Sequence, residues 1–374
     1  MPSKTPAQKC CCNCFASQAH LEEKLLRCVR CKVVFYCGRV CQKKHFPAHK
    51  LSCKTIANAY AALAREEQKL ADLQAFGTIG QVRAGSEDVH HGSCGLVKQV
   101  RHDIGTMTFQ LAYRSCDTPR RGGAMLEVAL DHFLELLRLQ SPILLADDAS
   151  ERPDQALLTR IVVLLVALDR DDDAFNMIDY FNRAGNDPSE ILDDVEGSTP
   201  GDWIYSPSGC SRFHPIECLG YASLESHKAA FNASRLCNPT VMVCLVLIKM
   251  RVLVEYRSDR RGWGRFVRTS EGRRLTDAHF IIEKYLLRDD SFVLEIEDDV
   301  RTLLMHIRLV DPFLMNHIRD TIPLSPEVAG CLFEPEASSE FWHLLQDCFF
   351  LSPGVNDILH DFVPDLPFDL LVET

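Results

Sequence analysis

From about residue 100 onward, apolar side chains recur at intervals of three and four residues, which is the spacing of one face of an α-helix. Pro153 and Asp154 suit the start of one helix, and Asn238 and Pro239 suit the start of another. The pattern therefore predicts a mainly α-helical body. The predicted helices span residues 124–139, 154–169, 172–183, 240–256, 277–287 and 339–349.

A further helix is expected at residues 56–75, which are rich in good helix formers. Residues 77–95 contain five glycines and favour a loop. In that loop His90, His91 and Cys94 are expected to be solvated rather than bound to a metal. The chain is thereby divided into a small module at 8–54, a connecting helix at 55–76, a loop or linker at 77–98 and an α-helical domain at 99–374.

Residues 161–181 predict two amphipathic helices joined by a short charged turn, with the small residue Ala174 at the helix crossing. This arrangement resembles a tetratricopeptide hairpin. No repeat of about 34 residues extends it into an array. We therefore expect an irregular helical domain with one or two such hairpins.

The cysteines are clustered at the N-terminus. Nine of the 17 lie within the first 53 residues, and the other eight are scattered singly between Cys94 and Cys348. A secreted disulfide scaffold is short and spreads its cysteines evenly. The clustering instead indicates metal ligands in a reducing compartment.

No segment predicts export or membrane insertion. The first residues lack the pattern of a secretory signal and lead directly into cysteines. The most apolar runs, 161–168 and 240–248, are far shorter than the ~20 residues that cross a bilayer. We expect an intracellular protein that is cytoplasmic, nuclear or both.

Eight ligand side chains form four closely spaced pairs. A C-x2-C pair places two sulfurs on one tight turn, and a spacing of four places two ligands one turn apart on a helix. Four pairs make two tetrahedral sites, one of four Cys and one of three Cys and a His, with no position left for water. We therefore predict two structural Zn²⁺ ions. The pairs are Cys11 with Cys14, Cys28 with Cys31, Cys37 with Cys41, and His49 with Cys53.

The run Tyr36-Cys-Gly-Arg-Val-Cys-Gln42, followed by His49-Lys-Leu-Ser-Cys53, resembles the MYND zinc finger. The resemblance implies an interleaved cross-brace, in which the first and third pairs hold one ion and the second and fourth pairs hold the other. Spacing alone leaves sequential pairing open. Because the segment has few large apolar residues, folding and zinc binding are expected to be one event.

Some positions depart from the MYND pattern. His45 and Phe46 stand where the family usually has Asp-Trp, and the gap before the second pair is longer than is common. Cys10 and Cys12 crowd the first pair, and we interpret them as spare thiols. His45 is expected on the helix surface rather than as a ligand, because His49 has the ligand spacing.

The resemblance also implies a partner. MYND fingers bind short proline-rich peptides, which lose little entropy when they dock against an aromatic side chain and a strand edge. The corresponding contact positions are Gln42 and Phe46. Phe46 lacks the indole N–H donor of Trp, so affinity or selectivity is expected to differ. The alternative interpretation is that Phe46 packs within the finger's own core.

Charge is divided unevenly along the chain. Residues 1–54 carry eleven Lys or Arg against two Glu, whereas the remainder carries 30 Lys or Arg against 50 Asp or Glu. Seven thiolates and two Zn²⁺ would leave the finger at about +6. Such a module could favour nucleic acid, but no helix shows base-reading residues at finger spacing, so a nucleic-acid-associated regulator is disfavoured.

Other polar groups favour plain structural interpretations. Cys210, His214 and Cys218 could suggest a third metal site, but they offer only three potential ligands in a long loop. The acidic runs 169–173 and 295–299 are expected to be a solvated turn and a helix start.

A SET-type methyltransferase is the main enzymatic alternative, because some MYND fingers lie within a SET domain. That architecture places SET sequence before the finger, and its Asn-His-Ser-Cys motif is missing here. Nucleophile-elbow, P-loop, dinucleotide and H-E-x-x-H patterns are also missing. We therefore expect a non-enzymatic adaptor whose finger binds a proline-rich segment of one protein and whose helical body binds a second partner.

Overall fold

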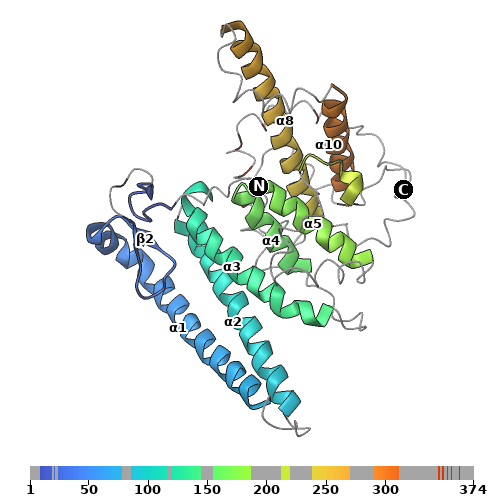
Figure 1. Cartoon of the computed structure of the whole chain (residues 1–374). Helices are drawn as coiled ribbons and strands as arrows, with labels where there is room; N and C mark the ends of the chain where they lie inside the picture. Colours follow the sequence, from blue (N-terminus) through green and yellow to red (C-terminus); the bar gives the residue numbers. More distant parts are fainter. Residues whose placement is uncertain are drawn as a thin grey trace. The chain divides into compact units, whose positions relative to one another are not determined.

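The computed structural model (Figure 1) describes residues 9–18, 21, 24–77, 86–115, 119–144, 155–186, 212–219, 238–269 and 290–310, with six single residues between Leu344 and Phe362. It divides into two compact units, Met1–Asp169 and Arg170–Thr374. The described elements are mainly α-helices with one pair of short strands, so the predicted fold class is confirmed. None of these helices is both long and apolar enough to span a bilayer.

The finger is a small module at the start of the first unit. Its strands, β1 (Leu26–Arg27) and β2 (Phe35–Tyr36), are antiparallel. Helix α1 (Arg39–Gly77) begins shortly after β2 and continues far beyond the finger. The predicted connecting helix at 55–76 is therefore the continuation of the finger's own helix rather than a separate element.

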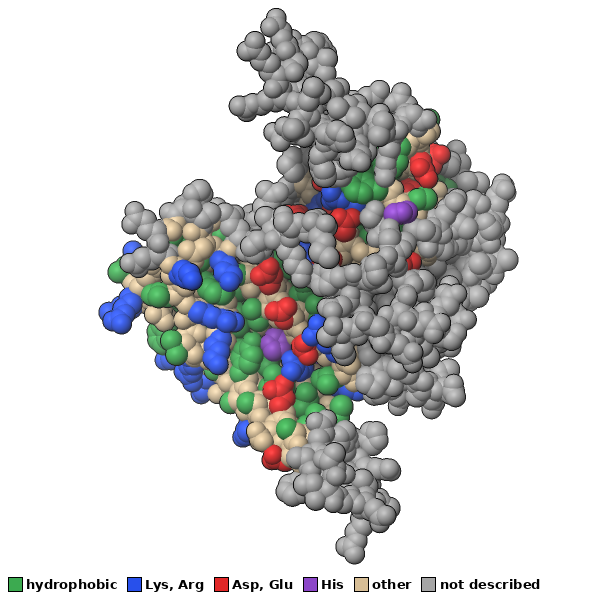
Figure 2. All heavy atoms as spheres, in the orientation of Figure 1, with side chains coloured by type: hydrophobic (Ala, Val, Ile, Leu, Met, Phe, Trp, Pro, Cys, Tyr) green, Lys and Arg blue, Asp and Glu red, His purple; other side chains and the backbone are tan. Residues whose placement is uncertain are grey.

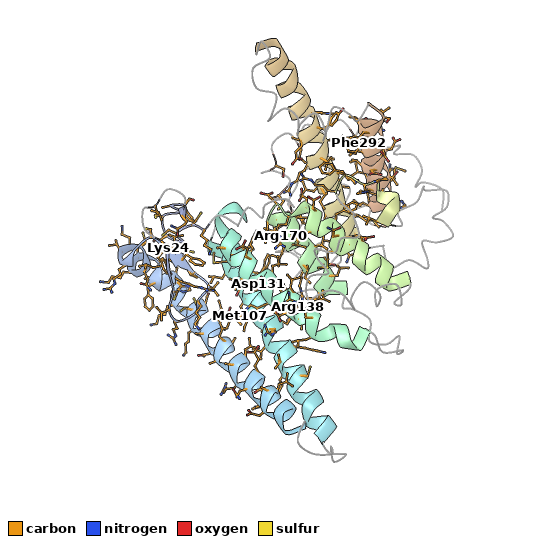
Figure 3. The ribbon with its side chains drawn as sticks, viewed as in Figure 1. Lys24, Met107, Asp131, Arg138, Arg170 and Phe292 are labelled. Atoms are coloured by element: carbon orange, nitrogen blue, oxygen red, sulfur yellow. The ribbon has the colours of Figure 1, made fainter. Side chains whose placement is uncertain are left out.

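Helices of the first unit pack on one another beyond the finger. Helix α2 (Ser86–Ser115) contacts both α1 and α3 (Pro119–Leu144), and α3 contacts α4 (Gln155–Ala167). Figure 1 shows α1 and α2 running side by side, and Figure 3 marks Met107 on α2 and Asp131 on α3. The long helix that holds the metal ligands is therefore anchored against a helical bundle.

Helix α2 corrects the expected loop at 77–98, because the described part of that segment, 86–98, is helical. Packing accounts for the difference. Val97 lies in a buried cluster with Leu63 of α1, and this burial outweighs the cost of about 1 kcal/mol for each glycine in a helix. The division between compact units lies after Asp169 and not in this segment.

The second unit is arranged around α8 (Pro239–Thr269). This helix contacts α10 (Asp290–Val310) and α5 (Asp171–Asn186). Helix α5 also contacts the short 3₁₀ helix η4 (Ile216–Leu219). Every residue from 241 to 250 is buried, which explains the long apolar run of this helix.

Lys249 of α8 makes the most deeply buried ion pair among the described residues. Its Nζ lies 2.9 Å from Oδ2 of Asp299 on α10, and the side chain of Lys249 is 0% exposed. The ammonium also donates to the carbonyl of His214 and lies 5.3 Å from the ring centroid of Phe175. Burial raises the pKa of Asp299, although the charge of Lys249 opposes this effect.

The predicted helices at 124–139, 154–169, 172–183 and 240–256 are confirmed, and they correspond to α3, α4, α5 and α8. Helices α3 and α8 extend well beyond the predicted bounds. Residues 277–287 lie outside the described residues, whereas Leu344, Leu345 and Cys348 of the predicted helix at 339–349 are helical. Helix α10 was not predicted as a helix of its own. Its apolar residues do follow helical spacing, namely Phe292, Ile296, Val300, Leu303 and Ile307.

Both expectations for the acidic runs need correction. The run 295–299 lies in the middle of α10 and not at a helix start, because its apolar neighbours continue the helix on both sides. In the run 169–173, Asp171 is buried at the start of α5 and pairs with Arg251 at 2.7 Å, so this carboxylate is not solvated. Carboxylates in the first turn of α5 do face the positive end of its dipole.

The predicted tetratricopeptide-like hairpin corresponds to α4 and α5. These helices belong to different compact units, and each is therefore described within its own unit. The turn that ends the first unit contains Asp169 at a left-handed φ of 56°. Ala174 of α5 is fully buried in the second unit.

Candidate metal centre

The first group of ligands joins the loop before β1 to the start of α1. Sγ of Cys14 lies 3.5 Å from Sγ of Cys37, which in turn lies 3.4 Å from Sγ of Cys41. With Cys11, these sulfurs all lie within 4.8 Å of one another. Four sulfurs at about 2.3 Å from a tetrahedral zinc would lie about 3.8 Å apart, so this donor set fits the ion.

The second group is fully buried and adds one nitrogen. Sγ of Cys28 lies 3.8 Å from Sγ of Cys53, and Sγ of Cys31 lies 3.4 Å from Nε2 of His49. All four ligand atoms lie within 4.8 Å of one another. The group fits a structural zinc of the Cys₃His type, with Nε2 as the nitrogen ligand.

The two C-x2-C turns share one backbone arrangement. The amide of Phe15 donates to the carbonyl of Cys11 at 2.8 Å, and the amide of Lys32 donates to the carbonyl of Cys28 at 2.9 Å. Phe15 and Lys32 each follow the second Cys of their pair, and each adopts a left-handed φ of 58°. The backbone therefore turns sharply at both sites and brings the sulfurs of each pair to one metal position.

The grouping is interleaved along the chain, as the MYND resemblance implied and spacing alone could not decide. The first and third pairs form one group, and the second and fourth pairs form the other. Helix α1 supplies ligands to both groups, Cys41 to the first and His49 with Cys53 to the second. One rigid helix therefore fixes the separation of the two ions.

His45 is not the plain surface residue that we expected. Its Nδ1 lies 3.0 Å from the hydroxyl of Tyr36, and its ring stacks on that of His49 with centroids 5.6 Å apart and an interplanar angle of 12°. Helical spacing places His45 one turn before His49, so the sequence contained the signal for this contact. The stack orients the ligand ring, a role common around metal sites.

The pKa values of the thiols do not by themselves separate ligands from their neighbours, because burial also raises the pKa of the ligand Cys31 to about 12. Burial raises the pKa of Cys12 to about 11, so this thiol stays protonated at neutral pH. Burial acts in the same direction at Cys11, but the backbone amides of Cys14, Cys37 and Asn13 outweigh it and lower the pKa to about 7. Cys11 is therefore the readier thiolate, and Cys12 belongs to neither ligand group.

The imidazole of His49 is also prepared for metal binding. Burial, with a smaller contribution from His45, lowers the pKa of His49 to about 4. The ring is therefore neutral at physiological pH, which is the form that binds zinc. Because every coordination position is filled by a protein ligand, the finger itself has no site for catalysis at the metal.

Among the candidates whose side chains the structure describes, no further one joins a metal site. Within the described ranges, the two groups above are the ones with metal-binding geometry, and Cys10 belongs to neither. Cys94 is half-buried on α2, and His214 is exposed. The side chains of His90 and His91 lie outside the described residues, as do the thiols of the predicted 210–218 cluster.

The predicted peptide contacts lie on α1 between its ligands. Gln42 is half-buried, and Phe46 is 49% exposed one helical turn later. Phe46 therefore does not pack within the finger's own core. This leaves its ring accessible to a partner.

Comparison with known proteins agrees with this geometry. Residues 11–53 match the family described as MYND finger. Within the finger, the chain is 51% identical over 35 residues to the human histone-lysine N-methyltransferase SMYD3, and this stretch covers 9% of the chain and 8% of that relative. No solved structure matches the chain significantly. The interleaved ligand groups and the family match together identify residues 11–53 as a MYND zinc finger.

Proposed function

We propose that this chain is an intracellular adaptor whose finger binds an extended, proline-containing segment of a partner protein and whose helical body binds a second partner. The observation that carries the proposal is the exposed ring of Phe46 beside Gln42 on one face of α1. The aromatic ring of Phe46 next to the side-chain amide of Gln42 suits a ligand that has an apolar ring and a free backbone carbonyl. A proline-containing segment provides both.

Rigidity of the helix favours this use. Phe46 lies between Cys41, a ligand of the first group, and His49, a ligand of the second. Both ions would therefore hold this part of α1 in place before a peptide arrives. A preorganised surface loses less conformational entropy on binding than a mobile one.

The outer edge of β1 offers a second recognition element. The amide of Cys28 donates to the carbonyl of Val34 at 2.8 Å, so the antiparallel pattern directs the amide and carbonyl of Arg27 away from β2. The opposite edge is in use, because the carbonyl of Phe35 accepts from the amide of Cys12 at 2.9 Å. Among the described residues, Arg27 makes no backbone hydrogen bond, so a peptide strand could add there.

Selection from a library of proline-containing peptides tests the proposal. The bait is the zinc-loaded full chain, and the control bait is Cys31→Ser, which loses a ligand of the second group. We expect peptides to be recovered with the intact chain and lost with the control. Recovery of the same peptides with Cys31→Ser would place the binding surface outside the finger and contradict the proposal.

We further propose that the chain is not a methyltransferase. The relative that has this activity by name is matched over only 8% of its length, within a finger whose metal sites are closed. Incubation of the zinc-loaded chain with histones and a labelled methyl donor should transfer no label. Transfer that persists in the Cys31→Ser variant would assign catalysis to the body and overturn this part of the proposal.

A further inference from the structure

One exposed face of α1 carries a line of positive charge. We define the basic stripe as Arg39, Lys43, Lys50 and Lys54, with Phe46 within it. Successive members lie three or four residues apart, so they follow one side of the helix. All five side chains are exposed. Figure 2 shows Lys and Arg gathered over the finger and the beginning of α1.

The positive charge of the stripe is not neutralised by neighbouring side chains. Between Arg39 and Arg65, α1 contains no Asp or Glu. Among the residues that the structure describes, none of the four cations of the stripe forms an ion pair. With seven thiolates and two Zn²⁺ counted, residues 1–54 still keep a net charge of about +6. The stripe therefore favours a ligand that brings carboxylates or other anionic groups.

Phe46 gives the stripe an apolar centre. Its ring is 49% exposed, and Pro47 and Ala48, which follow it, are exposed as well. Phe46 is the one Phe, Tyr or Trp between Arg39 and Lys54. A single-stranded nucleic acid stacks successive bases on several aromatic side chains. One aromatic ring with cations on both sides instead favours a peptide that brings one apolar group between two acidic ones.

The spacing of the stripe fits a ligand in the polyproline II conformation. Such a ligand has three residues per turn and rises about 3.1 Å per residue, so side chains three positions apart share one side and lie about 9 Å apart. On α1, at about 1.5 Å per residue, Lys43 and Arg39 lie about 4.5 Å and about 10.5 Å before Phe46. Lys50 and Lys54 lie about 6 Å and about 12 Å after it. On either side of Phe46, a position about 9 Å away therefore falls between two cations.

We propose that the basic stripe makes the finger selective for a partner segment in which a central proline has one acidic residue three positions before it and another three positions after it. This rests on the proposed function, because the proline would occupy the peptide site at Phe46. One carboxylate then lies between Arg39 and Lys43, and the other lies between Lys50 and Lys54. The spacing is the same in both directions of the peptide chain.

The test uses the zinc-loaded full chain and three capped peptides of equal length. The aligned peptide is Glu-Pro-Pro-Pro-Pro-Pro-Glu, and the neutral peptide has Gln in place of both Glu. The shifted peptide, Glu-Pro-Pro-Pro-Pro-Glu-Pro, has the composition of the aligned one, but its two Glu are five residues apart and lie on different sides of the ligand. We expect the aligned peptide to bind about tenfold more tightly than the neutral peptide and about threefold more tightly than the shifted one.

Two adjacent lysines separate the stripe from the general charge of the finger. Lys43 and Lys44 are both exposed on α1, but Lys44 lies outside the stripe. Lys43→Glu should weaken binding of the aligned peptide about tenfold, whereas Lys44→Glu should change it less than about threefold. Neither variant should change binding of the neutral peptide by more than about twofold, which also shows that the finger remains folded.

Equal binding of the aligned and neutral peptides, or of the aligned and shifted peptides, would overturn the proposal. Equal loss in Lys43→Glu and Lys44→Glu would overturn it too. Displacement of the aligned peptide by a single-stranded oligonucleotide at lower concentration would assign the stripe to nucleic acid instead. If library-selected peptides bind through Phe46 but the aligned peptide does not, this inference falls and the proposed function stands. If no proline-containing peptide binds, both fall.

Discussion

The hydroxyl of Tyr36 on β2 and Nδ1 of His45 on α1 lie 3.0 Å apart, which ties the hairpin of the finger to the helix that holds its ligands. Because the ring of His45 also stacks on His49, this hydrogen bond acts on the second metal site. We predict that His45→Ala lowers the zinc affinity of that site by about tenfold, as loss of supporting contacts around a metal does. Competition with a chromophoric chelator measures the change.

Tyr36→Phe removes only the hydrogen bond and should give a smaller loss of zinc affinity than His45→Ala. Lys44→Ala, an exposed neighbour of His45, serves as the control and should leave zinc affinity unchanged. Equal zinc affinity in His45→Ala and Lys44→Ala would show that the stack has no role at the metal.

Replacement of two glycines of α2 by alanine should change the stability of the fold in opposite directions. A Cβ at Gly105 would lie 2.8 Å from Cε1 of Phe133 on α3, whereas a Cβ at Gly95 meets no atom within 4 Å. Gly105→Ala should therefore destabilise the fold by about 1–3 kcal/mol through overpacking. Gly95→Ala should stabilise it by up to about 1 kcal/mol, because alanine favours the helix. Urea unfolding followed by circular dichroism tests both, and the same sign for both variants would contradict this packing.

His132 of α3 makes the stability of the first unit depend on pH. Burial, with a smaller contribution from Arg101, lowers the pKa of His132 from 6.5 to about 4, while its Nε2 lies 2.9 Å from the hydroxyl of Tyr60. A folded pKa below the unfolded value means that stability is fully present above pH 6.5 and falls as pH decreases toward 4. The expected loss is about 3 kcal/mol.

The His132→Gln variant isolates this contribution. Its free energy of unfolding is measured in urea at a series of pH values. Between pH 6.5 and about pH 4 this free energy should fall less than that of the intact chain. A decrease identical to that of the intact chain would show that His132 is protonated with its ordinary pKa in the folded state.

The ion pair of Lys249 and Asp299 should be costly to break. Asp299→Asn leaves the ammonium of Lys249 buried without a counter-charge, which typically destabilises by about 3–5 kcal/mol. Asp298→Asn is the matched control, because Asp298 pairs with Arg301 at the exposed surface of the same helix and should contribute less than about 1 kcal/mol. Chemical unfolding of both variants measures the difference, and equal stabilities would show that Lys249 is not charged in its buried position.

The finger was the most predictable part of the chain. Its ligand pairs are local in sequence, and the chemistry of zinc dictates their spacing, so the eight side chains can be identified from the sequence alone. The interleaving required the family resemblance, because sequence distance does not show which pairs meet in space. The role of His45 was missed although its spacing from His49 was visible.

The helical body was predictable only where periodicity was strong. Helix α2 was missed between residues 86 and 98 because its stability comes from packing against α1, which local propensity does not report. The buried pair of Lys249 and Asp299 was missed because the two residues are distant in sequence and each looks like an ordinary surface charge. Such contacts depend on which helix faces pack together, which a hydrophobic pattern does not specify.

The affinity of a library-selected proline peptide for the intact chain and for Phe46→Ala tests the central claim most directly. Leu51→Ala is the control, because Leu51 is also apolar and on α1 but is 78% exposed and lies five residues after Phe46, on another side of the helix. By isothermal titration of zinc-loaded protein, we predict a loss of about tenfold or more for Phe46→Ala and little change for Leu51→Ala. Equal affinities for the intact chain and Phe46→Ala would contradict the assignment of this face of the finger as a peptide site.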